Sequence, residues 1–190
     1  MKIRCKWAGS DPVYIDYHDN EWGVEVHDDR ILFEFLVLEG AQAGLNWITI
    51  LKKRDNYKKA FYNFEPVIIS AYDSNKIGSL LLNKGIIRNR LKIESAVNNS
   101  KAFLSVKKEF GSFDAYIWNF VGGKQIINSW ETHSQIPGFS KESIILSRDL
   151  KKRGFTFIGP TICYAFMQAT GMVNDHTTDC FRYEEIKAAS

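Results

Sequence analysis

The stretch LKKRGFTFIGPT, residues 150–161, has the features of a helix end, a glycine turn and a new helix start. Gly154 follows three basic residues, at a position where helices commonly stop. Gly159 and Pro160 open the second helix, because proline is tolerated in a first helical turn. Free backbone N–H groups there, beside the basic residues, form a seat for a phosphate. The pattern predicts either a DNA-backbone contact that does not read sequence or an ordinary connection between packed helices; the candidate contacts are Lys151, Lys152, Arg153, Gly154 and Gly159.

Helical patterns also dominate the rest of the chain. Asp28 is placed to cap a helix whose apolar run, Ile31 to Leu38, is nearly continuous and so must be buried on most sides. Glycines such as Gly40 and Gly44 fall where segments end. We see no convincing strand, and the pair Ile126-Ile127 is too short to count as one. One mostly α-helical domain over residues 1–190, in two lobes, is predicted, with further helical segments at 47–61, 74–82, 88–110, 113–120, 141–153 and 161–170.

Composition limits the protein class. The chain has 190 residues, of which 45% are hydrophobic and 14% aromatic, enough for a packed core without disulfides. No run approaches the roughly 20 apolar residues of a membrane span, and no signal peptide is visible at the start. Three cysteines without a secretory signal favour a reducing compartment, so we expect a cytoplasmic protein. Cys163 lies in an apolar stretch and is expected to be a buried small hydrophobe. No feature asks for more than a monomer.

Two cysteines and two histidines stand near the ends of the chain. Cys5 and His18 have the spacing Cys-x12-His, whereas His176 and Cys180 have the spacing His-x3-Cys. On a helix, that second spacing puts both side chains on one face about one turn apart, as two ligands of a tetrahedral zinc require. The alternative is four scattered residues with no common role. If they bind one ion, the two ends of the domain are held together.

The net charge of +3 is small, but the basic residues are clustered. One cluster is the triplet at 151–153. A second comprises residues 52–54 with Lys58 and Lys59, and the third Arg88, Arg90 and Lys92. Together they favour a polyanionic partner such as DNA, although each alone also suits a solvated helix face.

Aromatic residues and one acid form a second constellation. Tyr14 and Tyr17 are three residues apart and so share a helical face, with Trp7 and Trp22 on either side and Trp47 further along. Glu39 ends the apolar run, at the negative end of a helix and beside apolar side chains, where an acid is poorly placed for stability. Either it turns to water or it meets a cation. Aromatic faces with a carboxylate are the chemistry of a cage for a flat cationic ligand.

Several blocks of this sequence resemble one family. They are RCKW at 4–7, DPVYIDYHDNEWG at 11–23, LEGAQAGLNW at 38–47, and the region from KRGF at 152–155 through VNDH at 173–176. The chain resembles the 3-methyladenine DNA glycosylase I family of the helix-hairpin-helix glycosylase superfamily. The resemblance implies an all-helical, two-lobed fold and a structural zinc bound by Cys5, His18, His176 and Cys180.

The same resemblance implies release of 3-methyladenine from double-stranded alkylated DNA as part of base excision repair. A damaged base is cheaper to flip out of the duplex than a well-stacked one. Trp7, Tyr14, Tyr17 and Trp47 are then expected to contact the flipped base, and Glu39 to hydrogen-bond it and read its charge.

Two departures from the wider superfamily bear on mechanism. Many members have a catalytic aspartate in a Val-Asp-Thr-His-like segment, whereas this chain has VNDH at 173–176, so the role of Asp175 stays open. Bifunctional members have a lysine nucleophile where this chain has residues 160–162, Pro-Thr-Ile. Without that amine no Schiff base forms, so we predict a monofunctional enzyme that leaves an abasic site.

Two other classes remain as alternatives. A zinc hydrolase keeps one coordination position open, whereas two Cys and two His close the tetrahedron. A non-catalytic helix-hairpin-helix DNA-binding module explains the basic turns but leaves Glu39 and the aromatic residues without a role.

Overall fold

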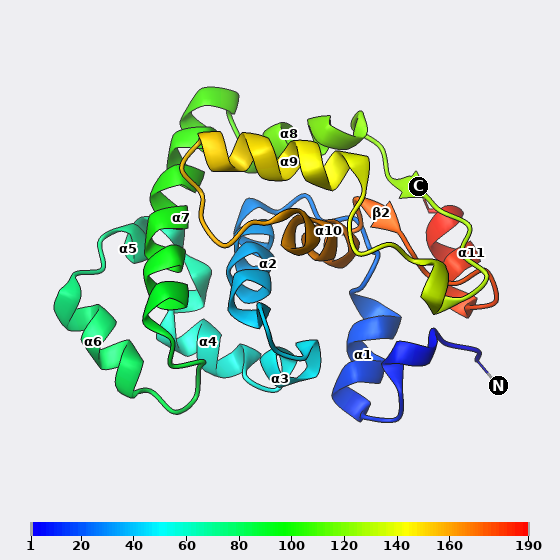
Figure 1. Cartoon of the computed structure of the whole chain (residues 1–190), viewed down its shortest axis with the longest axis horizontal. Helices are drawn as coiled ribbons and strands as arrows, with labels where there is room; N and C mark the ends of the chain where they lie inside the picture. Colours follow the sequence, from blue (N-terminus) through cyan, green and yellow to red (C-terminus); the bar gives the residue numbers. More distant parts are fainter. Residues whose placement is uncertain (1, 190) are drawn as a thin grey trace.

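Helices make up nearly all regular structure in the computed structural model, which describes residues 2–189 (Figure 1). The α-helices are α1 (Pro12–Asn20), α2 (Asp29–Gln42), α3 (Trp47–Leu51), α4 (Arg54–Ala60), α5 (Pro66–Ser70), α6 (Ser74–Leu82), α7 (Arg90–Phe110), α8 (Phe113–Trp118), α9 (Lys141–Lys152), α10 (Pro160–Ala169) and α11 (Phe181–Lys187). Short 3₁₀ helices are η1 (Lys6–Ala8), η2 (Tyr62–Phe64), η3 (Asn119–Val121) and η4 (His133–Gln135). The prediction of a mostly helical fold is confirmed.

Helix α2 is the centre of the core. The Asp28 carboxylate caps its start, accepting hydrogen bonds from the backbone N–H groups of Arg30 and Ile31. Ten consecutive residues, Leu32–Ala41, are buried, because α7, α8 and α10 pack around the helix (Figure 1). Burying a leucine- or phenylalanine-sized side chain stabilises the fold by roughly 1.5–3 kcal/mol. The near-continuous apolar run therefore has the buried environment that it requires.

The segment 150–161 is a helix–turn–helix, formed by α9 and α10. Gly154 has a φ of +89°, which favours glycine, and Gly159 is the residue before α10. The side chain of Asn99 in α7 holds the turn: its amide donates to the Thr156 carbonyl at 2.9 Å, and its oxygen accepts from the Thr156 N–H at 2.8 Å. The turn is thus fixed to α7 by hydrogen bonds that mimic backbone pairing.

One expectation about strands is wrong. Ile126 and Ile127 form β1, which pairs in parallel with β2 (Val173–Asn174), Ile126 opposite Val173. Two residues carry no period that a sequence pattern can reveal, because the partner strand lies far away in the chain. The small ladder continues as an isolated bridge between Trp130 and Thr177. It places the segment after β2 beside the loop that precedes α9.

Two local expectations need correction, and one helix was missed. Residues 47–61 form two helices, α3 and α4, with a break at Lys52 and Lys53. Gly40 does not end a segment, since α2 continues to Gln42. Gly40 lies within α2 and faces Phe157 in the turn before α10, where an added Cβ would make ordinary contact at 3.7 Å. Helix α5 was not predicted.

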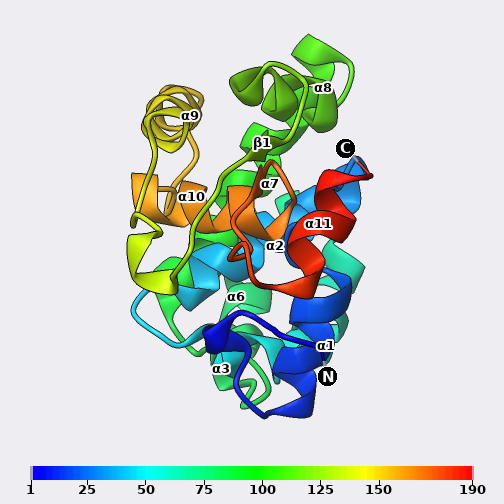
Figure 2. The ribbon, with the colours of Figure 1, turned by 90° about the vertical axis from the view of Figure 1, so that its right-hand side faces the viewer.

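The two ends of the chain meet. Figure 2 shows α11 beside the N-terminal segment and α1, and the Phe181 N–H donates to the Ile3 carbonyl at 3.0 Å. Cys163 is buried, as predicted. Among residues 2–189, no helix is long and apolar enough to cross a membrane.

Candidate active site and metal centre

The predicted aromatic residues lie in one cluster. Tyr14 and Tyr17 project from α1, Trp7 from η1 and Trp47 from the start of α3. The ring centroids of Trp7 and Tyr14 are 5.0 Å apart, those of Trp7 and Tyr17 6.3 Å, and those of Tyr17 and Trp47 5.6 Å. Trp22 packs on Trp7 at 4.9 Å. Three segments, η1, α1 and α3, thus build a wall of four aromatic rings, Trp7, Tyr14, Tyr17 and Trp47, which we call the cage.

Glu39 is buried beside this cage, with only 3% of its surface exposed. Burial raises the pKa of its carboxyl to about 8. Desolvation raises the pKa of Tyr14 and of Tyr17, and the charge of Glu39 adds to both shifts, so the acid faces the tyrosine wall. Within residues 2–189 the carboxyl has no hydrogen bond or ion pair. The Glu39 carboxyl is therefore free to bind a ligand.

Trp47 has the same property. Its indole Nε1 is buried and has no hydrogen-bond partner among the residues that the structure describes. A buried polar group usually finds a partner, and leaving it without one costs roughly 1–3 kcal/mol. An unpaired donor and an unpaired acid in one aromatic cluster are the signs of a ligand site.

A hollow of about 230 Å³ opens beside the cage. Trp7, Tyr14 and Trp22 form one side of it, and His133, Ile136 and Gln168 the other. Sequence reasoning missed this second side, because η4 and α10 carry no pattern that relates them to α1. The hollow borders the Trp7 and Tyr14 side of the cage, whereas Tyr17, Trp47 and Glu39 do not line it.

Ionic contacts hold α1 against the core. The Arg54 guanidinium in α4 binds the Glu34 carboxylate of α2 at 2.5 Å and the Glu21 carboxylate after α1 at 2.6 Å. Lys52 pairs with Asp11, the residue that caps α1. The basic cluster at 52–54 is therefore largely used within the protein. It sets the position of α1, and with it Tyr14 and Tyr17.

Cys5, His18, His176 and Cys180 converge in the interior. Their donor atoms lie within 4.8 Å of one another, and all four residues are buried. Both sulfurs are 3.5 Å from His176 Nδ1, and Cys180 Sγ is 3.5 Å from His18 Nε2. Zinc bonds of about 2.0 Å to nitrogen and 2.3 Å to sulfur place neighbouring ligands of a tetrahedron roughly 3.5 Å apart. The donor set and its spacing fit zinc.

The expected helix under His176 and Cys180 is not there. His176 follows β2 in extended backbone, and Cys180 is the residue before α11, with a turn closed by the Cys180 N–H on the Thr177 carbonyl at 2.8 Å. The residues still converge, because the turn shortens the path as a helical turn does.

The outer nitrogen of each histidine also has a partner. His18 Nδ1 lies 2.8 Å from the Asp19 carboxylate, which Arg4 binds, and His176 Nε2 lies 3.0 Å from the Trp22 carbonyl. Such partners orient metal-bound histidines. The hydrogen bond from Arg4 is the main reason that the pKa of Asp19 is lowered, to about 2.

The thiols of Cys5 and Cys180 lie close together in this cluster. Hydrogen bonding between them lowers the pKa of Cys180 and raises that of Cys5. Two thiols and two oriented imidazoles then have one space between them that a cation fits.

Asp175 is buried and fully hydrogen-bonded. Its carboxylate accepts from the side chains of Asn128 and Trp130 on one oxygen and from Tyr164 and Gln168 on the other, at 2.6–2.8 Å. It joins the β1 region to α10.

The predicted DNA contacts lie together at the end of α9. Lys151 and Lys152 are exposed, whereas the Arg153 guanidinium binds Asp149 at 2.7 Å and Glu109 at 2.8 Å. Gly154 forms the turn and Gly159 precedes α10. The two lysines are thus the freer cations of the triplet.

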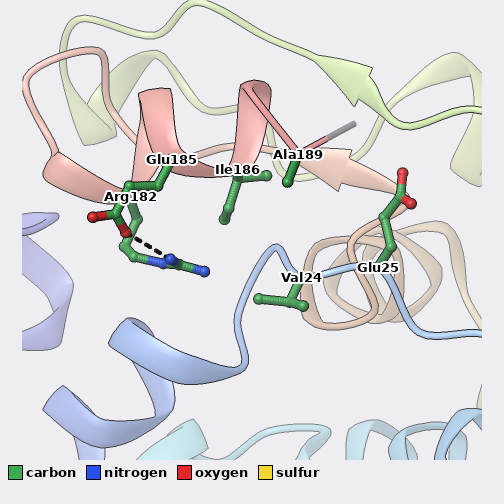
Figure 3. A pocket seen from close by; sticks show the side chains of 6 residues that line it. All are labelled: Val24, Glu25, Arg182, Glu185, Ile186 and Ala189. Carbon is green, nitrogen blue, oxygen red and sulfur yellow. Dashed lines mark hydrogen bonds and ion pairs between the residues drawn. The ribbon is translucent and has the colours of Figure 1, made fainter.

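A second hollow, of about 200 Å³, lies between α11 and residues 24–25 (Figure 3). Val24, Ile186 and Ala189 line it, and the pair Arg182–Glu185, at 2.7 Å, forms its polar side. None of the predicted site residues lines it. The candidate ligand site is therefore the hollow beside the cage rather than this second one.

Solved structures similar to this chain identify its class of protein. The chain superimposes on a crystal structure of 3-methyladenine DNA glycosylase I with a TM-score of 0.92 at 50% identity, covering 94% of this chain and 98% of that one, so its fold is that of a DNA glycosylase. It also matches, with a TM-score of 0.91 at 36% identity over 94% of this chain and 96% of that one, a tyrosine-to-phenylalanine variant of such an enzyme in complex with 3-methyladenine.

A sequence profile of the methyladenine glycosylase family matches residues 7–183. The DNA-3-methyladenine glycosylase 1 of Escherichia coli K12 is 47% identical over 180 residues, which are 95% of this chain and 96% of that protein. The chain belongs to the methyladenine glycosylase family.

Proposed function

We propose that this protein is a monofunctional DNA glycosylase that flips 3-methyladenine out of alkylated double-stranded DNA and releases it by hydrolysis, leaving an abasic site. The observation that carries the proposal is Glu39, a buried acid without a partner beside a cage of four aromatic rings. The relatives named for this activity, at close to half identity, support it.

The chemistry follows from the charge of the damaged base. Methylation at N3 makes adenine cationic, which weakens the bond between the base and C1′ of the sugar. The aromatic faces of the cage attract a flat cation, and an ionised Glu39 stabilises it. As the bond breaks, its electron pair leaves with the base, which becomes neutral. Water adds to C1′ and loses a proton, giving the abasic sugar.

Neutral adenine gains less from the same cage. It cannot compensate for the cost of ionising a buried carboxyl, and its extrusion from a well-stacked pair costs more. Selectivity then rests on charge, with shape as a second filter.

The raised pKa of Glu39 predicts a pH dependence. At limiting DNA, kcat/KM for base release should rise with pH until about 8, because only the ionised carboxylate attracts the cation. At saturating enzyme the rate should level off at lower pH, since the bound cation favours ionisation. Single-turnover rates from pH 5.5 to 9.5 measure both profiles. A kcat/KM that is flat across this range would contradict the role of Glu39.

For the metal centre we propose a structural zinc bound by Cys5, His18, His176 and Cys180. The buried donor set, its close spacing, with three donor pairs at 3.5 Å, and the oriented histidines support it. With four protein ligands no position is open for water, so the ion supplies stability rather than chemistry. It joins the segment before α1 to the segment before α11.

For DNA binding we propose that the turn between α9 and α10 contacts the phosphate backbone, as a helix-hairpin-helix motif does. Lys151 and Lys152 lie at its edge, and the start of α10 presents free N–H groups. Arg153 is also held by two carboxylates, so its share is smaller. That the protein acts as a monomer in the cytoplasm stays a prediction from sequence.

Replacing Lys151 and Lys152 by Gln should weaken binding of undamaged duplex DNA and lower the slope of log K against log salt by about one to two. The rate of base release at saturating enzyme should stay the same, because neither lysine reaches the cage. Titrations between 50 and 300 mM salt measure the slope. Lys101→Gln, an exposed cation on α7, is the control, and equal slopes for all three proteins would contradict this contact.

Helix α10, the second helix of the hairpin, reads PTICYAFMQA and so contains no lysine that could attack C1′. We therefore expect no covalent complex when borohydride is added to the reaction with alkylated DNA. Denaturing gels measure this directly, with a bifunctional glycosylase as the positive control. A trapped complex would show lyase chemistry.

The test of the proposal is chromatographic. The protein is incubated with DNA treated with a methylating agent, and the released bases are identified. We expect 3-methyladenine, with 7-methylguanine left in the DNA. If a folded, metal-loaded protein binds DNA but releases no base, the chain is a binding module.

A further inference from the structure

Lys92 belongs to one of the basic clusters that favoured a polyanionic partner, but its side chain turns inward. From α7 its ammonium donates to the Ala41 carbonyl at 2.8 Å and to the Ala43 carbonyl at 2.6 Å. Desolvation lowers the pKa of Lys92, consistent with an ammonium drawn out of water. Its donors are used by the protein before any DNA arrives.

The acceptors lie at the end of α2. The last carbonyls of a helix have no partner within it, and they form the negative end of the helix dipole. The Gln42 carbonyl accepts from the Leu45 N–H at 2.7 Å, and the Gln42 side chain donates to the Leu45 carbonyl at 3.0 Å. The Lys92 ammonium donates to the carbonyls of Ala41 and Ala43, the residues on either side of Gln42. A cation at this end both caps the helix and neutralises its dipole.

This end of α2 joins two parts of the cage. Glu39 precedes Ala41 by two residues, and Trp47 follows Ala43 by four. Between them the chain reverses at Gly44, whose φ is +77°. The ammonium therefore grips the connection that sets how far the Trp47 ring stands from the Glu39 carboxyl.

We propose that Lys92 is a positioning residue for base release, which acts by holding the end of α2 and the turn at 43–46 rather than by contacting DNA. The inference rests on the proposed glycosylase function. A charge-assisted hydrogen bond to a backbone carbonyl is stronger than a neutral one, and here two converge on one turn. Small displacements of a positioned group have large effects on rate.

The test uses Lys92→Met, which keeps much of the side-chain length and removes the donors, and Lys92→Arg, which keeps the charge. Lys101→Met, an exposed cation on the same helix, is the matched control. Three quantities are measured on each full-length protein: hydrogen exchange of the Leu45 amide, the single-turnover rate of 3-methyladenine release at saturating enzyme, and the salt dependence of DNA binding.

In Lys92→Met we expect the Leu45 amide to exchange at least roughly ten times faster and the rate to fall roughly tenfold, with DNA affinity and salt slope unchanged. Lys92→Arg should restore most of the Leu45 amide protection and most of the rate. In a Glu39→Gln background, Lys92→Met should have little further effect on rate, because the two residues act together. The Lys101 control should match the wild type.

An unchanged Leu45 exchange overturns the inference, and so does an unchanged rate in an active protein. A lower salt slope would show that Lys92 contacts phosphate instead. If Lys92→Met does not fold, Lys92→Gln, which keeps a neutral donor, takes its place. If the wild type releases no base, the proposed function fails, and the inference is then decided by Leu45 exchange and by the affinity for free 3-methyladenine, which must fall in Lys92→Met.

Discussion

Glu39→Gln is expected to slow 3-methyladenine release by roughly 10²–10³-fold, the usual effect of removing one preorganised electrostatic group from an active site. The amide keeps the size of the side chain and some of its hydrogen bonding but cannot carry the negative charge that a cationic base requires. Single-turnover rates at saturating enzyme measure the loss. Since binding of undamaged DNA does not involve the cage, its affinity should not change.

The same substitution is expected to stabilise the protein. Burial raises the pKa of Glu39 from 4.5 to about 8, so the folded state binds this proton more tightly than the unfolded state. The contribution of protonated Glu39 to the stability of the folded state is fully present below pH 4.5 and is lost as the pH rises through about 8. At pH 9 the cost of the buried charge reaches about 5 kcal/mol. Glu39→Gln removes that cost, so its stabilisation should grow from pH 4 to pH 9.

Glu34→Gln is the matched control. Glu34 is equally buried on the same helix, but it is paired with Arg54 at 2.5 Å. Removing its charge should lower stability, because Arg54 loses a partner in the interior. Urea unfolding at several pH values compares the two. If Glu39→Gln destabilised the protein as Glu34→Gln does, Glu39 would be a structural group and not a group kept for a ligand.

Metal removal is expected to have the second large effect. Binding to the folded state alone stabilises by about 4 kcal/mol when free zinc is 1,000 times its Kd, which for a domain of this size is about 10 °C in the unfolding temperature. A strong chelator, or Cys180→Ser, should lower the unfolding temperature by that amount or more. Thermal unfolding and elemental analysis of the same samples measure stability and zinc together.

Cage geometry should follow the metal. Trp7 packs on His18 with ring centroids 5.2 Å apart, and Trp22 packs on His176 at 4.6 Å, so two aromatic residues contact proposed metal ligands. Loss of zinc should therefore weaken binding of free 3-methyladenine while leaving residual base release. Cys163→Ser, a buried thiol outside the cluster, should keep both zinc and binding. Full stability and full metal content in Cys180→Ser would contradict the ligand set.

Local sequence patterns carried much of the fold. Capping by Asp28 and the apolar run after it predicted α2 and its burial, and residues 74–82 form a helix over their full predicted length. The glycine turn at 154 and the helix start at 159–160 were also predicted. These features depend on neighbours within a few residues, so the sequence alone contains their physical cause.

Features that depend on distant partners were missed or misassigned. The β1–β2 ladder joins residues 47 apart in the chain, and its two-residue strands have no pattern of their own. Arg54 and Lys92 look like surface cations in sequence, but carboxylates and helix-end carbonyls from other segments draw them inward. A sequence shows which residues are charged but not which groups they pair with in the fold.

By itself, the sequence determined the residue types of the site: aromatic rings, one acid at a helix end, two Cys and two His. These follow from composition and short spacings. Only the tertiary structure decided that Glu39 is buried without a partner, that four Cys and His donor atoms lie within 4.8 Å of one another, and that Lys92 holds the turn between acid and ring. Burial and convergence arise when segments far apart pack together, since desolvation and distance belong to the folded chain.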